Sequence, residues 1–209
     1  QLLFSNYADL ALPLPGESHA EGLQVAGLFD GVAGRDFCGR IVRTLERAAG
    51  YQHTEPGTPV TAEAARYYVL AYDWRQDNVA TARQLHALIE QIRRDHGDPT
   101  LKVDVIPHSM GGLALRYYLR YGTEDVLASN AFPVNGIGAE RIRRLVLLGT
   151  PNLGSITAMT SLLEGQRVGL RRVPEEVMLS FPSVYQLIPH ALTPWLVTET
   201  GKPLPRAQF

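Results

Sequence analysis

The sequence lacks the features that mark several classes of protein. It contains a single cysteine, Cys38, so an internal disulfide is excluded. The formal net charge is −1, which gives no reason to expect nucleic acid or an acidic membrane as a partner. No apolar run approaches the roughly 18 residues that a membrane-spanning helix needs.

Patterns that hold metals or phosphates are missing as well. No group of cysteines and histidines has the spacing of metal ligands, and no glycine-rich stretch is of the kind that cradles phosphates. We therefore expect neither a metal ion nor a cofactor. No aspartate follows Asp125, and His190 is the only histidine after residue 109.

What the sequence does contain is an alternation of helical and extended patterns. Three apolar runs have the composition of buried strands: residues 67–72, 102–106 and 145–148. Apolar residues recur at helical spacing in stretches that end at Gly50, Gly97 and near Gly122. This alternation predicts the α/β class with a doubly wound, mostly parallel sheet, and a length of 209 residues suits one such domain.

Residues 155–209 show no clear strand pattern. Leu162 and Leu163 indicate a short helix, and residues 181–189 are apolar and interrupted by proline. A long insertion without strands that follows a sheet strand is typical of a lid over an active site. We therefore expect residues 1–209 to be one partial domain in which about 155–209 begin a lid.

The most informative stretch is residues 107–112 (PHSMGG), which lie between the expected strand at 102–106 and an apolar helical stretch. A strand, a sharp turn with serine and then a helix form the context of a nucleophile elbow. The turn lifts the Ser109 hydroxyl above the sheet edge, and Gly111 and Gly112 leave room for the helix to pack closely.

Ser109 is therefore the predicted nucleophile, because a serine that only caps the helix would not need the two glycines or the preceding strand. The backbone N–H of Met110 would point to the place where an oxyanion forms. His108 is predicted to support the turn by a hydrogen bond rather than to catalyse. His190 fits a general base poorly, since no late sheet strand separates it from the glutamates that precede it.

Active residues of a parallel sheet gather at the carboxyl ends of its strands. Asp73, Ser109 and Thr150 all fall at such positions. The residues expected to form or support a pocket there are Tyr72, Asp73, Trp74, Arg75, Thr150 and Pro151. Trp74 would supply a large apolar wall, whereas a local ion pair that organises the loop is the alternative role for Asp73 and Arg75.

Several segments, taken in order, carry a family resemblance. They are residues 45–51 (LERAAGY), 71–75 (AYDWR), 108–112 (HSMGG), 149–155 (GTPNLGS) and 182–189 (PSVYQLIP). Together they resemble the lecithin:cholesterol acyltransferase-like group of α/β-hydrolases, over roughly residues 38–190. The elbow is shared by many hydrolases, and the preceding Tyr-Asp-Trp-Arg makes the resemblance more specific.

The resemblance implies an α/β-hydrolase fold and acyl transfer from a lipid or other ester through Ser109. Water as acceptor would make the protein an esterase, lipase or phospholipase, and an alcohol would make it an O-acyltransferase. Transient contact with a lipid surface is also implied. In the family, the triad acid and histidine follow the position of Phe209, and further strands precede that of Gln1, so we expect a piece of a longer protein. Without that histidine as a base, we expect residues 1–209 alone to be catalytically inactive. Pro107 departs from the family, which usually has a small residue there.

Two other functions stay open at the level of sequence. One is a general carboxylesterase that acts on small esters. The other is a binding protein that keeps the hydrolase fold and has lost its triad.

Overall fold

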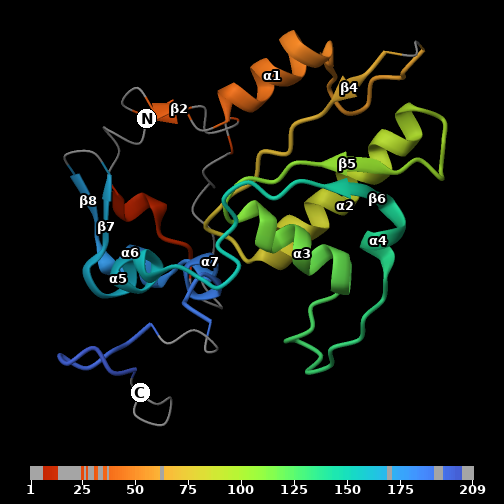
Figure 1. Cartoon of the computed structure of the whole chain (residues 1–209). Helices are drawn as coiled ribbons and strands as arrows, with labels where there is room; N and C mark the ends of the chain where they lie inside the picture. The colour runs from red at the N-terminus through yellow and green to blue at the C-terminus, as the bar shows by residue number, and fades with distance from the viewer. Residues whose placement is uncertain are drawn as a thin grey trace. The chain divides into compact units, whose positions relative to one another are not determined.

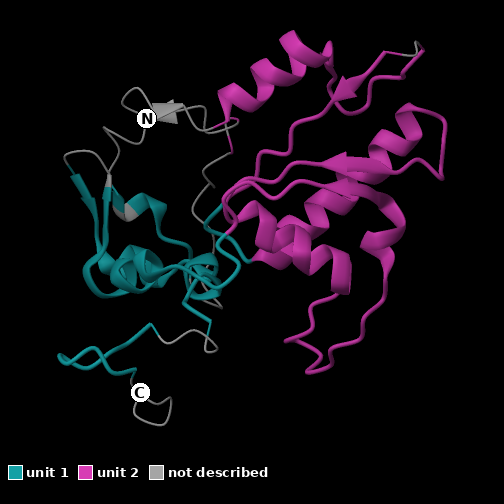
Figure 2. Ribbon diagram, viewed as in Figure 1, with its two compact units in different colours: residues 1–23, 74–77, 151–209 teal, residues 24–73, 78–150 magenta. Residues whose placement is uncertain are grey.

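The computed structural model describes residues 7–13, 25, 27, 31–32, 35–36, 38–61, 64–168, 171–190 and 195–203. The chain forms two compact units, which Figure 2 shows in different colours. Unit 1 consists of residues 1–23, 74–77 and 151–209, and unit 2 consists of residues 24–73 and 78–150. Each unit has a hydrophobic cluster of its own.

Unit 2 carries the elements from β1 to β6 and from α1 to α4 in Figure 1. In chain order they are β1 (Gly31–Val32), β2 (Arg35–Asp36), α1 (Gly39–Ala49), β3 (Gln52–His53), β4 (Arg66–Tyr67), α2 (Asn78–Asp95), β5 (Val103–Val105), α3 (Gly111–Tyr121), α4 (Ile137–Arg141) and β6 (Ile142–Leu145). The strands pair two by two: β1–β2 is antiparallel, whereas β3–β4 and β5–β6 are parallel.

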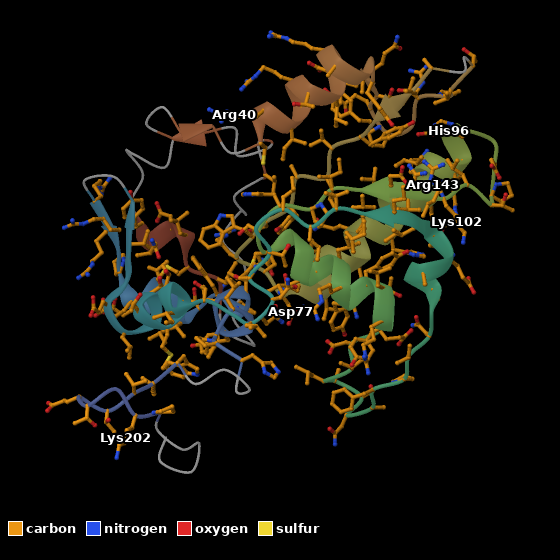
Figure 3. All side chains as sticks on the ribbon, in the orientation of Figure 1. Arg40, Asp77, His96, Lys102, Arg143 and Lys202 are labelled. Atoms are coloured by element: carbon orange, nitrogen blue, oxygen red, sulfur yellow. The ribbon has the colours of Figure 1, made fainter. Side chains whose placement is uncertain are left out.

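The β5–β6 pair positions the candidate site. Backbone hydrogen bonds continue its pairing past the two strands, as far as an isolated parallel bridge between His108 and Leu148. Because β5 and β6 are parallel, both strands begin at the same end of the pair. Figure 3 labels Lys102 and Arg143 at that end. Both run toward the opposite end, where Ser109 follows the bridge.

Helices α2 and α3 pack against each other and against the β5–β6 pair (Figure 1). The apolar stripe that helical spacing predicts on α2 consists of Leu85, Leu88, Ile89 and Ile92. Three of these residues are buried as predicted, and Leu88 is half-buried. The ends predicted at Gly50 and Gly122 are confirmed too, as both residues cap helices. The cluster buried in unit 2 comprises Ala82, Leu85, Ile89, Leu115, Tyr118 and Ile142.

The predicted doubly wound sheet is wrong as far as the described residues go, because each sheet has two strands. The strand expected at 102–106 is present as β5. Of the run 67–72, only Tyr67 belongs to a strand, because no described neighbour continues the ladder beyond β3. A strand exists only where a second backbone takes its hydrogen bonds, and apolar composition cannot supply that.

The run 145–148 differs from the expected buried strand in both position and burial. β6 begins earlier, at Ile142, and ends at Leu145. Arg143 and Arg144 therefore lie inside the strand rather than before it, and Arg143 pairs with Asp104 of β5 at 2.7 Å. Val146 is 52% exposed, so this run is not a buried strand.

Unit 1 is built from short elements. They are η1, a 3-10 helix (Tyr7–Leu10), α5 (Ile156–Glu164), β7 (Gln166–Val168), β8 (Arg171–Val173), α6 (Glu175–Leu179) and α7 (Pro182–Gln186). The expectation of no strand after residue 155 is wrong, because β7 and β8 form an antiparallel pair. Each of these strands has only three residues, and together they contain three arginines. They therefore lack the alternation of apolar and polar residues by which a strand is predicted from sequence.

The core of unit 1 includes part of the N-terminal segment, residues 1–22, whose prolines and glycine predict an irregular surface excursion. Tyr7 is only 4% exposed and joins a cluster with Ala158, Val173, Val177, Met178, Phe181 and Val184. The N–H of Leu12 donates a hydrogen bond to Ser180 Oγ at 2.9 Å. Residues 1–6 and 14–22 of the predicted excursion lie outside the described residues.

Candidate active site

Ser109 has a backbone conformation that L-residues seldom adopt. Its φ is +53°, and among the described non-glycine residues only Asn130 shares a positive φ. Left-handed backbone costs a residue with a Cβ about 1–2 kcal/mol. Such strain persists where the surroundings fix the backbone, and it is typical of functional sites.

Three backbone hydrogen bonds fix the turn around Ser109. The Ser109 N–H donates to the carbonyl of Leu148 at 2.8 Å, which joins the turn to the chain that follows β6. The N–H of Gly111 donates to the carbonyl of His108, and that of Gly112 donates to the carbonyl of Ser109, each at 3.0 Å. Ser109 itself is exposed.

The two glycines after the serine have different reasons to be glycine. A methyl group added at Gly112 would lie 1.9 Å from Thr150 Oγ1, so helix α3 can approach the end of the β6 segment only without a side chain there. A methyl group at Gly111 would meet nothing closer than the Tyr72 hydroxyl at 3.5 Å, which is ordinary contact. The close approach that the sequence predicted therefore depends on Gly112.

The backbone N–H of Met110 has the environment expected of an oxyanion donor. Met110 is the N-cap of the 11-residue helix α3, and its N–H donates to no other described residue. The free N–H groups and aligned peptide dipoles at a helix N-terminus favour negative charge. The Met110 side chain is buried and so contributes packing.

Tyr72 and Thr150 lie beside the elbow within unit 2. Burial raises the pKa of the Tyr72 phenol, and the nearby Cys38 thiol raises it further, so the hydroxyl stays neutral at physiological pH. Thr150 Oγ1 is buried and has no hydrogen-bond partner among the described residues. Asp73 is half-buried and His108 is exposed.

The other predicted pocket residues, Trp74, Arg75 and Pro151, belong to unit 1. The Arg75 side chain is buried, and its Nη1 donates to the carbonyl of Leu10 at 2.7 Å, which ties η1 into that unit. Trp74 is 47% exposed and packs against Phe181 edge to face, with the ring centroids 5.3 Å apart. Trp74 also lines a cavity of about 250 Å³ whose lining residues all belong to unit 1.

His190 also belongs to unit 1, where its N–H donates to the carbonyl of Leu153 at 2.7 Å. Across the described ranges, no three His, Cys, Asp or Glu side chains gather as a metal site would require. Within the same ranges, no helix combines the length and the apolar character that crossing a membrane demands.

The family model of lecithin:cholesterol acyltransferase matches residues 62–201, about two thirds of the sequence. The chain belongs to the lecithin:cholesterol acyltransferase family. The matched range contains the elbow, the Tyr-Asp-Trp-Arg segment and most of unit 1. Membership implies the α/β-hydrolase fold and, in general terms, acyltransferase or phospholipase-type chemistry on lipids. No curated protein sequence gives a significant match.

Sequence reasoning missed most of the residues that line the cavity beside Trp74. They lie in α5, β7, α6 and α7 or cap these helices: Ser155, Thr157, Ala158, Ser161, Gln166, Met178, Val184 and Leu187. A signal was present, because Val177, Phe181, Val184 and Leu187 recur at helical spacing. The prolines in that stretch concealed it, although Pro182 merely begins α7.

Proposed function

We propose that this protein transfers the acyl group of a lipid ester through Ser109 as its nucleophile. The observation that carries the proposal is the positive φ of Ser109 at a strand–turn–helix junction, where the backbone is held by Leu148 and by the contact of Gly112 with Thr150. Membership of a family that acts on lipids supports the substrate class.

In the proposed reaction, Ser109 Oγ attacks the ester carbonyl carbon while a general base takes the hydroxyl proton. The carbonyl oxygen becomes an oxyanion that accepts a hydrogen bond from the Met110 N–H. The C–O bond to the leaving alcohol then breaks, the alcohol takes the proton, and an acyl-serine ester remains. Water or a second alcohol repeats these steps and releases the acyl group.

We further propose that about residues 155–209 begin a lid. This segment follows the last parallel strand, and it contains the helices that surround the cavity. A lid that excludes water would decide whether water or an alcohol resolves the acyl-serine.

A covalent fluorophosphonate probe tests the nucleophile. We expect the complete protein to be labelled and its Ser109→Ala variant to remain unlabelled, because losing the nucleophile typically costs about 10⁶-fold in kcat. Ser129→Ala is the matched control, since Ser129 is also exposed but lies in an ordinary turn. Equal labelling of the Ser109→Ala variant would end the proposal.

A series of p-nitrophenyl esters from acetate to dodecanoate tests the substrate class. A lipid enzyme should show kcat/KM rising with chain length, because added methylenes are buried in the transition state. A preference for acetate would favour a general carboxylesterase. A folded protein with neither labelling nor turnover would favour a binding protein.

A further inference from the structure

A hydrogen bond between His86 of α2 and Tyr118 of α3 lies where three helices of unit 2 meet. His86 Nδ1 is 2.9 Å from the Tyr118 hydroxyl, and the two ring centroids are 5.9 Å apart. Helix α3 packs against both α2 and α4 (Figure 1). The contact with α4 is close, since a methyl group added at Gly138 would lie 2.5 Å from the carbonyl oxygen of Tyr118.

The Tyr118 hydroxyl depends on His86 for its hydrogen bond. Tyr118 has no exposed surface, and among the residues that the structure describes its hydroxyl bonds to His86 alone. Burial raises the pKa of the phenol to about 12, so Tyr118 keeps its proton at physiological pH. A buried O–H without an acceptor loses its hydration and gains nothing in return, which makes His86 the required acceptor.

His86 can accept this hydrogen bond only while it is neutral. A neutral imidazole with its proton on Nε2 presents Nδ1 as an acceptor, whereas a protonated imidazole carries a proton on both nitrogens. After protonation the Tyr118 oxygen could accept from Nδ1, but the hydroxyl proton of Tyr118 would have no acceptor among the described residues. Protonation of His86 therefore leaves a buried donor unpaired.

The groups around His86 mostly oppose its protonation. Burial of the half-buried ring has the largest effect, followed by the positive charge of Arg141 on α4. On α2 itself, Glu90 favours a protonated ring and Arg93 opposes it, but Glu90 is engaged by Arg141 at 2.7 Å. Together these effects hold the pKa of His86 below its ordinary value of 6.5.

We propose that the His86–Tyr118 hydrogen bond is a pH-sensitive link, which holds α3 on α2 while His86 is neutral and weakens when His86 is protonated. A histidine whose pKa is depressed by folding contributes fully above its unfolded value of 6.5, and this contribution is lost as pH falls through the lower folded value. Helix α3 begins two residues after Ser109, so loosening α3 in acid loosens the elbow. The proposal concerns the packing of α3 and does not rest on the chemistry of Ser109.

Proton NMR of the imidazole C–H groups measures the titration directly. The sequence has six histidines, and the signals of His86 are those missing from the His86→Asn variant. We expect His86 to titrate below pH 6.5. Tyr118→Phe should move this titration upward toward 6.5, because no hydroxyl proton is then left unpaired on protonation. The variant removes one oxygen atom and leaves the ring in place, so it tests the hydrogen bond rather than the packing.

Thermal unfolding between pH 7.5 and 5.5 measures the link itself. His86→Asn keeps an amide oxygen close to the position of Nδ1 and does not titrate, so the acid-induced fall of the melting temperature should shrink by about 2–4 °C. Hydrogen exchange, corrected for intrinsic rates, should show α3 losing protection at pH 5.5 in the wild type and keeping it in His86→Asn.

His96→Gln is the matched control. His96 directly follows α2, and its Nε2 also meets a tyrosine hydroxyl, that of Tyr68 at 3.1 Å, but this pair does not involve α3. We expect α3 in His96→Gln to lose protection in acid as it does in the wild type. A His86 titration at or above pH 6.5, or one that Tyr118→Phe leaves unchanged, would overturn the proposal. So would acid-induced loss of protection in α3 that is the same in a folded His86→Asn variant as in the wild type.

Discussion

At the scale of single residues, the elbow depends on a strained serine held by unstrained neighbours. The positive φ of Ser109 is stabilised by its hydrogen bond to Leu148 and by the absence of a side chain at Gly112. The positive φ costs about 1–2 kcal/mol. This cost is large enough that, if the hydrogen bond to Leu148 or the close packing at Gly112 were lost, the Ser109 backbone would move to a more favourable conformation.

Gly112→Ala should destabilise the protein by about 1–3 kcal/mol and reduce labelling of Ser109, because the new methyl group collides with Thr150. Gly111→Ala is the matched control one position away. It has room for a methyl group and lies in a helix, so we expect an unchanged or slightly raised stability. Urea unfolding of both variants measures the difference.

The partner of the collision offers a second test. In a Gly112→Ala/Thr150→Gly double variant, the three Thr150 atoms that would clash are gone. The double variant should therefore be less destabilised than the sum of its single changes, with a coupling of about 1 kcal/mol or more. Strict additivity would show that Gly112 matters for some reason other than Thr150.

At the scale of elements, an ion pair links α2 to the junction of α4 and β6. Arg141 Nε lies 2.7 Å from Glu90 Oε1, and both side chains are largely buried. The hydrogen bond from Arg141 holds the pKa of Glu90 below its usual range, against the opposing effect of burial. The pair therefore joins α2 to the last residue of α4, 51 residues further along the chain.

The lowered pKa of Glu90 predicts a loss of stability in acid. A carboxyl whose pKa is depressed in the folded state contributes fully above its unfolded value of about 4.5, and this contribution disappears as pH falls through the lower folded value. Burial lowers the pKa of nearby His86, and its protonation destabilises in the same direction. Glu90→Gln isolates the first effect and should flatten the fall of the melting temperature below pH 4.5.

Glu140→Gln is the control for this pH dependence. Glu140 approaches the same arginine at 3.8 Å but is mostly exposed, where a salt bridge contributes little. Its loss should leave the acid profile nearly unchanged. Equal flattening in both variants would mean that net charge, rather than the Glu90–Arg141 contact, sets the profile.

The elements also show which signals a sequence carries. Helix α2 was predictable because its buried stripe is a local pattern, and the elbow was predictable because Ser109, Gly111 and Gly112 lie in one short stretch. The β7–β8 pair and the limits of β6 were not, because a strand depends on a partner backbone elsewhere in the chain. The cavity beside Trp74 was missed for the same reason, since five separate segments form it.

At the scale of the whole molecule, each unit has its own buried cluster. Phe181 is fully buried in the cluster of unit 1, and Leu115 is almost fully buried in that of unit 2. Neither cluster includes a buried residue of the other unit. Cooperative unfolding follows shared cores, so damage to one cluster should be felt mainly within its own unit.

Phe181→Ala should lower the free energy of unfolding of unit 1 by about 3–5 kcal/mol, and Leu115→Ala should lower that of unit 2 by about 2–5 kcal/mol. Hydrogen exchange followed by mass spectrometry should show lost protection in α5–α7 for the first variant and in α2–α3 for the second. Each variant serves as the control for the other. Protection lost throughout the chain in both cases would show a single cooperative core.

The hydrogen bond from Leu12 to Ser180 joins residues 168 positions apart. During translation the chain emerges from its N-terminus, so η1 leaves the ribosome long before α6 and α7, which complete its surroundings, have been made. The elements of unit 2 emerge in between and can assemble first. Until then Tyr7 lacks the core that buries it, and exposed apolar surface of this kind makes a nascent chain prone to aggregate.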